Sequence, residues 1–123
     1  MRGIMALQTR DPLCSLEERR APELEIQLGH VCTNRCVFCG SGRLNEQRLA
    51  KPVPTPMVVA ALEAARAQGT TRVTLLGGEP TIHRDFLAVL GRAQELGFSE
   101  VVVFTNGVML GQRGFLDRVL DLG

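Results

Sequence analysis

Three cysteines stand within eight residues of this 123-residue chain. They are Cys32, Cys36 and Cys39, spaced as C-x3-C-x2-C, and Cys14 lies eighteen residues before them. A disulfide framework usually spreads its cysteines along the chain to close long loops, whereas thiolates grouped on one short segment are typical of metal ligands. The spacing therefore predicts a metal site at residues 32–39, and Cys14 is interpreted as a loop or buried thiol outside it.

Two kinds of metal site fit this spacing. Three thiolates can bind three irons of a cubane iron–sulfur cluster and leave the fourth iron open to a small-molecule ligand. His30, two residues before Cys32, would instead complete a non-catalytic zinc site of the Cys3His type. Free structural thiols are a third interpretation, and the cysteine spacing alone does not decide between them.

The segments that would position these cysteines alternate between strands and helices. Residues 24–28 and 72–76 are predicted strands, and the apolar run 101–104 is typical of a strand covered on both faces. Amphipathic helices are predicted from Thr55, as N-cap before Pro56, to about residue 68, then over 85–96 and about 114–122. Residues 40–54 are predicted to form a long loop, in which Arg43, Arg48 and Lys51 are solvated or meet an anionic substrate.

This order of elements predicts where the chemistry gathers. Strands joined through helices must run parallel, so their carboxyl ends meet at one edge of the sheet. The cysteine segment, Gly77-Gly78-Glu79-Pro80 and Thr105-Asn106-Gly107 each follow one strand, and ligands of parallel α/β proteins bind at that edge. Taken alone, either glycine-containing segment also fits an ordinary turn.

Taken together, these motifs resemble those of the radical S-adenosylmethionine (radical SAM) superfamily over about residues 24–107. The resemblance rests on the three cysteines with Phe38 before the last, on Gly-Gly-Glu-Pro and on Thr-Asn-Gly, in that order. It implies an α/β fold made of three βα units of a parallel partial (β/α) barrel. Residues 1–22 are then an irregular leader and 23–123 a partial core domain. Because the family's core commonly has six such units, we expect the chain to be the amino-terminal half of a longer enzyme.

The resemblance also implies cofactors and their residues. Cys32, Cys36 and Cys39 would bind a [4Fe–4S] cluster whose open iron is chelated by S-adenosylmethionine. Reductive cleavage of that cofactor would give a 5′-deoxyadenosyl radical, which takes hydrogen from a substrate that the sequence does not identify. No catalytic residue is identified beyond the cluster ligands. The predicted cofactor-binding residues are Phe38, near the adenine, Gly77, Gly78, Glu79 and Pro80, near the methionine ammonium, and Thr105 and Asn106. The implied partner is an electron donor of the flavodoxin or ferredoxin type.

Composition and charge narrow the classes of protein to which the chain can belong. Hydrophobic residues make up 45% and charged residues 22%, as in globular proteins, and the net charge of +1 gives no indication of nucleic-acid binding. No apolar run reaches the roughly 18–20 residues that a membrane span needs. The expectation is a cytoplasmic enzyme without a membrane partner.

Overall fold

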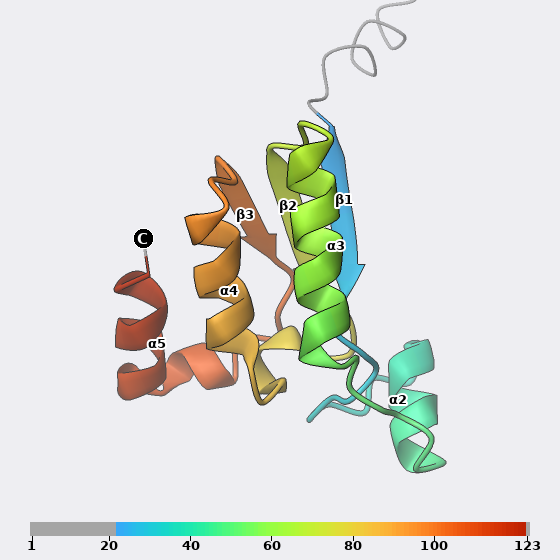
Figure 1. Ribbon diagram of the computed structural model, residues 1–123. Coiled ribbons are helices and arrows are strands. Elements are labelled where there is room, and N and C mark those ends of the chain that lie inside the picture. Colours follow the sequence, from blue (N-terminus) through green and yellow to red (C-terminus); the bar gives the residue numbers. More distant parts are fainter. Residues whose placement is uncertain (1–21, 123) are drawn as a thin grey trace, which may run out of the picture.

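The computed structural model describes residues 22–122. Nearly all of the predicted leader, Cys14 included, therefore lies outside the described residues. Within them, strands β1 (Glu23–Gln27), β2 (Arg72–Leu76) and β3 (Glu100–Val103) form a parallel sheet in the order β1-β2-β3. The α/β class and the three parallel strands are confirmed (Figure 1).

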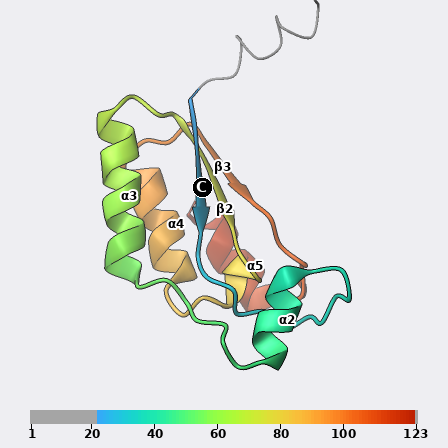
Figure 2. The same cartoon turned by 90° about the vertical axis from the view of Figure 1, so that its right-hand side faces the viewer.

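Two helices connect the strands and lie on the same face of the sheet. Helix α3 (Thr55–Ala67) leads from β1 to β2, and α4 (Phe86–Glu95) leads from β2 to β3. Figures 1 and 2 show them side by side along that face. Helix α5 (Arg113–Leu120) follows β3, and the rings of Phe86 and Phe115 stack with centroids 6.0 Å apart, which joins α5 to α4.

The core lies between these helices and the sheet because strand residues alternate between the two faces. The register places Ile26, Leu75 and Val103 side by side on the helical face. Leu62 of α3 and Val89 of α4 are fully buried against this layer. The apolar stripes of both helices thus explain why they dock as they do.

The face of the sheet opposite α3 and α4 carries charged and partly exposed side chains. Glu23, Arg72 and Glu100 share one register row, with Arg72 Nε 3.4 Å from Glu23 and 3.6 Å from Glu100. Val102 is only half-buried and Phe104 is 63% exposed. The prediction that residues 101–104 are covered on both faces is therefore wrong for the described chain, because α3 and α4 both pack on the other face.

Two further local predictions are corrected. Part of the predicted loop 40–54 is a short helix, α2 (Gly40–Glu46), whose glycines and serine give no helical signal. The N-cap of α3 is Pro54, with Thr55 as the first helical residue. The Thr55 hydroxyl caps nothing and instead donates to Asp85 Oδ2 at 2.5 Å, which ties the starts of α3 and α4 together. Among the described residues, no helix has the length and apolarity needed to cross a bilayer.

Candidate functional site

The loops after β1 and β2 lie against each other through their backbones. Leu28 N donates to Leu76 O at 2.8 Å, and the pairing continues beyond the strands, where Gly78 N donates to Gly29 O at 2.8 Å. Glu79 N then donates to Val31 O at 2.9 Å, one residue before Cys32. The segment after β2 thus fixes the backbone that leads into the cysteines.

Gly77 and Gly78 permit this close approach. A Cβ atom at Gly77 would lie 2.4 Å from Gly29 O, and one at Gly78 would lie 2.4 Å from the carbonyl oxygens of both His30 and Val31. Real Cβ atoms do not come so near, so any side chain would push the loops apart. The sequence predicted close backbone contact with a ligand at these glycines. The close contact that the structure shows is with residues 29–31, which lead into the segment 32–39, called the cysteine loop below.

Glu79 joins the second loop to the third. Its Oε1 accepts hydrogen bonds from Thr81 N (3.1 Å), Thr81 Oγ1 (2.5 Å) and Thr105 Oγ1 (2.7 Å), and its Oε2 accepts one from Asn106 N (2.6 Å). Burial by itself raises the pKa of this carboxyl, but the hydrogen bonds from Thr81, Asn106 and Thr105 outweigh burial and hold the pKa below its ordinary value. Glu79 is therefore an ionised, buried acceptor between these loops.

Asn106 closes the connection back to the first loop. Its Nδ2 donates to Thr33 Oγ1 at 3.2 Å, next to Cys32, although the two residues are 73 positions apart. Its Oδ1 accepts from Val108 N at 3.1 Å, which forms a turn after β3. The predicted convergence of the three loops at the carboxyl edge of the sheet is confirmed by these contacts.

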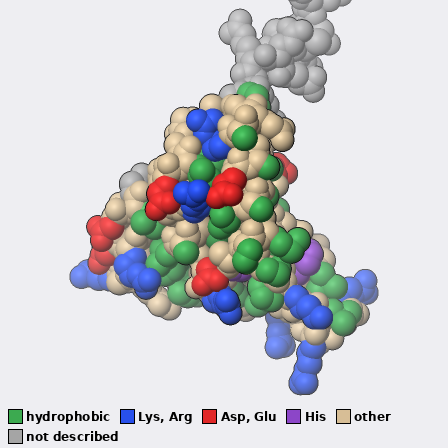
Figure 3. All heavy atoms as spheres, viewed as in Figure 1, with side chains coloured by type: hydrophobic (Ala, Val, Ile, Leu, Met, Phe, Trp, Pro, Cys, Tyr) green, Lys and Arg blue, Asp and Glu red, His purple; other side chains and the backbone are tan. Residues whose placement is uncertain are grey.

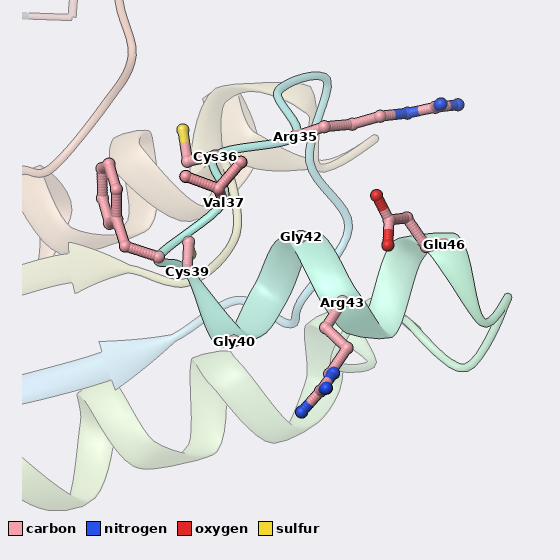
Figure 4. A pocket seen from close by; sticks show the side chains of 9 residues that line it. Arg35, Cys36, Val37, Cys39, Gly40, Gly42, Arg43 and Glu46 are labelled. Carbon is pink, nitrogen blue, oxygen red and sulfur yellow. The ribbon is translucent and has the colours of Figure 1, made fainter.

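The cysteines occupy an open part of this edge. Cys32 is half-buried, whereas Cys36 and Cys39 are exposed, and all three are free thiols. Figure 4 shows Cys36 and Cys39 beside α2, in a hollow of about 560 Å³. Cys39 immediately precedes α2, where the N–H groups of Gly42 and then Ser41 lower the pKa of its thiol and so favour the thiolate that binds metals.

The three thiols lie on one loop, but their sulfur atoms are not gathered around a common metal position in this structure. Within residues 22–122, no three His, Cys, Asp or Glu side chains lie close enough together to hold a metal ion. Cys32 Sγ accepts a hydrogen bond from Asn34 N at 3.3 Å, and His30 Nδ1 lies 3.1 Å from Ser41 Oγ. The donor set itself, three thiols on an exposed loop with one favoured as thiolate, fits an iron–sulfur cluster after side-chain rotation.

Two side chains at the tip of the cysteine loop are strongly exposed. Val37 is 102% and Phe38 is 90% exposed, so neither packs against the folded chain. Arg35 and Arg43 line the same hollow and point away from each other (Figure 4). Figure 3 shows basic side chains standing out from the region of α2. The loop thus offers apolar and cationic groups to solvent.

Sequence reasoning missed Asn45, which lies in α2. Its Nδ2 donates to His30 O at 2.6 Å and to Ser41 O at 2.7 Å, and its Oδ1 accepts from Cys32 N at 3.2 Å. No signal in the sequence points to it, because the segment has no helical pattern and an isolated asparagine usually indicates a turn.

Comparison with known proteins agrees with this geometry. The family model described as the Radical SAM superfamily matches residues 26–123. A probable GTP 3′,8-cyclase from Sulfurisphaera tokodaii is 37% identical over 108 residues, which cover 82% of this chain and 34% of that protein.

Two further relatives carry the same name. The protein from Thermoplasma volcanium is 33% identical over 114 residues, 87% of this chain and 34% of its own length. The protein from Saccharolobus solfataricus is 33% identical over 93 residues, 75% of this chain and 29% of its own length. The chain thus spans about a third of the length of these relatives. With its cysteine loop, its glycine-rich second loop and this family match, the chain belongs to the radical SAM superfamily, whose enzymes use a [4Fe–4S] cluster and S-adenosylmethionine.

Proposed function

We propose that this chain is the cluster-binding part of a radical SAM enzyme that acts on GTP. The observation that carries the proposal is the cysteine loop, joined by backbone pairing to Gly78 and Glu79 in a chain 37% identical to a probable GTP 3′,8-cyclase. The non-catalytic zinc alternative has less support, since His30 Nδ1 lies beside Ser41 and the family match covers the whole described site.

The cysteines have the first role in this proposal. Cys32, Cys36 and Cys39 are the residues that would hold the cluster, and with three thiolates for four irons one iron would have no protein ligand. When bound, the cluster and S-adenosylmethionine together supply one-electron cleavage of a sulfonium bond and a carbon radical that removes hydrogen. The electron comes from a reduced carrier protein of the flavodoxin or ferredoxin type.

The neighbouring loops have the second role, which is to hold the cofactor. Phe38 is exposed beside the cysteines and offers an aromatic face to the adenine. Glu79 Oε2 accepts one hydrogen bond and retains an acceptor position for the methionine ammonium. Gly77, Gly78 and Pro80 set the path of this loop, and Thr105 and Asn106 hold the Glu79 carboxylate in place.

The substrate follows from the names of the relatives. Closing a ring between positions 3′ and 8 of GTP forms a bond from the ribose to the base, so ribose carbon 3′ must lose a hydrogen atom. Removal of this hydrogen is the chemistry that the cluster and S-adenosylmethionine would supply when bound. Bond formation at carbon 8 uses the double bond between carbon 8 and nitrogen 7, and the radical left on the base would take one electron from the reduced carrier and one proton from solvent. We therefore assign GTP as the substrate of the enzyme to which this chain contributes.

Anaerobic reconstitution with iron and sulfide tests the cluster. We expect about four irons per chain, a broad absorption band and formation of 5′-deoxyadenosine after reduction in the presence of S-adenosylmethionine. Cys36→Ala is expected to lose the cluster, because removal of one thiolate exposes a second iron. Cys14→Ala serves as the matched control and is expected to keep it. One zinc per chain without colour would contradict the proposal.

Deuterated GTP tests the substrate separately. In the enzyme to which this chain contributes, we expect deuterium at carbon 3′ of GTP to appear in 5′-deoxyadenosine, and ATP labelled at the same position is the control. Cofactor cleavage that GTP neither stimulates nor labels would contradict GTP as substrate while leaving the cluster assignment intact.

A further inference from the structure

The cysteine loop has little packing of its own. Every residue from 35 to 40 is exposed, and the half-buried Cys32 has its backbone N–H bonded to a side chain of α2. Thiols on such a loop would sample many positions unless bonds at the loop's two ends restrict them. Within the loop, Cys39 N donates to Cys36 O at 3.0 Å and Asn34 N to Cys32 Sγ at 3.3 Å. These short-range bonds do not fix the loop relative to the rest of the chain, so contacts at its two ends must do so.

Asn45 supplies that restriction from α2. It bonds His30 O and Cys32 N before the loop and Ser41 O after it, at 2.6, 3.2 and 2.7 Å. One amide group thereby joins the two ends of the cysteine loop. Only a side chain with both donor and acceptor can do this, since two partners are carbonyls and the third is an N–H group.

The packing of α2 supports the same role. Gly42 is buried, and a Cβ atom there would lie 3.2 Å from Cys36 O. The helix therefore sits directly against the loop backbone at the second cysteine while Asn45 holds the backbone of the first. Cys39, the third, is the residue from which α2 begins.

We propose that Asn45 is a positioning residue for the cluster, which it never touches: its side chain fixes the backbone of Cys32 relative to α2 and so keeps the first cysteine beside the other two, ready for side-chain rotation to bring the three thiols onto one cluster. This inference rests on the proposed function, in which these cysteines bind the cluster. Groups that orient metal ligands in this way typically change metal affinity about 10- to 100-fold when they are removed.

Three variants test the role in the reconstituted chain. Asn45→Ala removes all three bonds, Asn45→Asp keeps the shape and the acceptor for Cys32 N–H but loses both donated bonds, and Gln47→Ala is the matched control on an exposed neighbour. We measure the rate of iron loss to a ferrous chelator, the electron paramagnetic resonance spectrum of the reduced cluster, and hydrogen exchange of the Cys32 amide in the metal-free chain. Far-ultraviolet circular dichroism checks that each variant folds. If Asn45→Ala does not fold, the test relies on Asn45→Asp.

We expect iron loss to be about 10- to 100-fold faster in Asn45→Ala and unchanged in Gln47→Ala. Asn45→Asp is expected to be at least as fast as Asn45→Ala, because a carboxylate oxygen would then face the carbonyl oxygens of His30 and Ser41. The spectrum of the reduced cluster and the exchange rate of the Cys32 amide should change in Asn45→Ala and remain as in the parent in Gln47→Ala. Equal iron loss from the parent and Asn45→Ala, or equal acceleration in Gln47→Ala, would overturn the role of Asn45 and leave the proposed function standing. A parent chain that takes up no iron would overturn both.

Discussion

Glu79 carries out its structural role with a single carboxylate that accepts four hydrogen bonds from three residues. Hydrogen bonds donated to a buried carboxylate favour its ionised form and offset the cost of burying its charge. The family resemblance assigns the carboxylate oxygens of Glu79 to cofactor binding. In the structure the same oxygens join two loops. Removal of this side chain should therefore affect stability before any cofactor is present.

The lowered pKa of Glu79 gives this effect a pH dependence. The folded pKa lies below the unfolded value of about 4.3, so the stabilisation is complete above that value and is lost as the pH falls through the folded pKa. We expect Glu79→Gln to lower the free energy of unfolding at pH 7 by about 1–3 kcal/mol and by less at pH 3. Urea denaturation of the metal-free chain at both pH values measures it. A difference between parent and variant that is the same at both would contradict the assignment.

Phe38, unlike Glu79, should affect cofactor binding and leave stability unchanged, because its side chain packs against no other described residue. We expect Phe38→Ala to leave the free energy of unfolding within about 0.5 kcal/mol of the parent and to weaken S-adenosylmethionine binding about tenfold or more, the usual effect of removing an aromatic that stacks on a base. Calorimetry on the reconstituted chain measures the affinity. Val37→Ala, one residue away and itself fully exposed, is the control, and the same loss of affinity in both variants would argue against stacking.

At the scale of elements, periodicity predicted most of the fold. The apolar stripe of α3 is a strong sequence signal because one face of the helix is buried, with Val58, Leu62 and Ala65. The alternation in β1 is strong for the same reason. Helix α2 escaped prediction because Gly40, Ser41 and Gly42 have low helix propensity. Contacts with the cysteine loop hold that helix, and such contacts are invisible to a local pattern.

The candidate site shows the same division. The meeting of the three loops was predictable, because parallel strands end at one edge. Their bonding partners were not, because Glu79 reaches Asn106 across 27 positions and Asn106 reaches Thr33 across 73. Such pairs depend on register and loop path, which the sequence motifs do not encode locally.

A substitution at Gly78 tests the contact between the loops that follow β1 and β2. We expect Gly78→Ala to lower the free energy of unfolding by about 1–3 kcal/mol and to speed iron loss, because its Cβ would lie 2.4 Å from two carbonyl oxygens of the segment before Cys32. Urea denaturation and chelator assays measure both.

Gly114→Ala is the matched control for that variant. It places a Cβ in helix α5 with no heavy atom within 4 Å and is expected to stabilise by about 0.5–1 kcal/mol. An unchanged stability of Gly78→Ala would mean that the two loops are not held as tightly as the structure indicates.

At the scale of the whole molecule, the described sheet is covered by α3 and α4 on one face only. Val102 is half-buried on the other face, Phe104 is 63% exposed, and β3 pairs with β2 alone among the described strands. An uncovered strand edge beside apolar side chains favours association between chains.

We therefore expect the 123-residue chain, studied alone, to self-associate as its concentration rises, and Phe104→Lys to reduce that association. Sedimentation velocity over a range of concentrations measures it. Leu120→Lys changes an exposed apolar residue of α5, away from β3, and is the control. A parent chain that stays monomeric at every concentration would show that this face does not promote association.

The ring of contacts around Cys32 also has a consequence for the order of events during synthesis. Val31 is held by Glu79, Glu79 by Asn106, and Asn106 by Thr33, so Cys32 lies inside a circuit that only residue 106 completes. Pairings between such distant positions form late in folding. The cysteines therefore leave the ribosome early with the local restraint of Asn45, and the restraint that reaches them from the loop after β3 is added only when Asn106 has bonded Thr33.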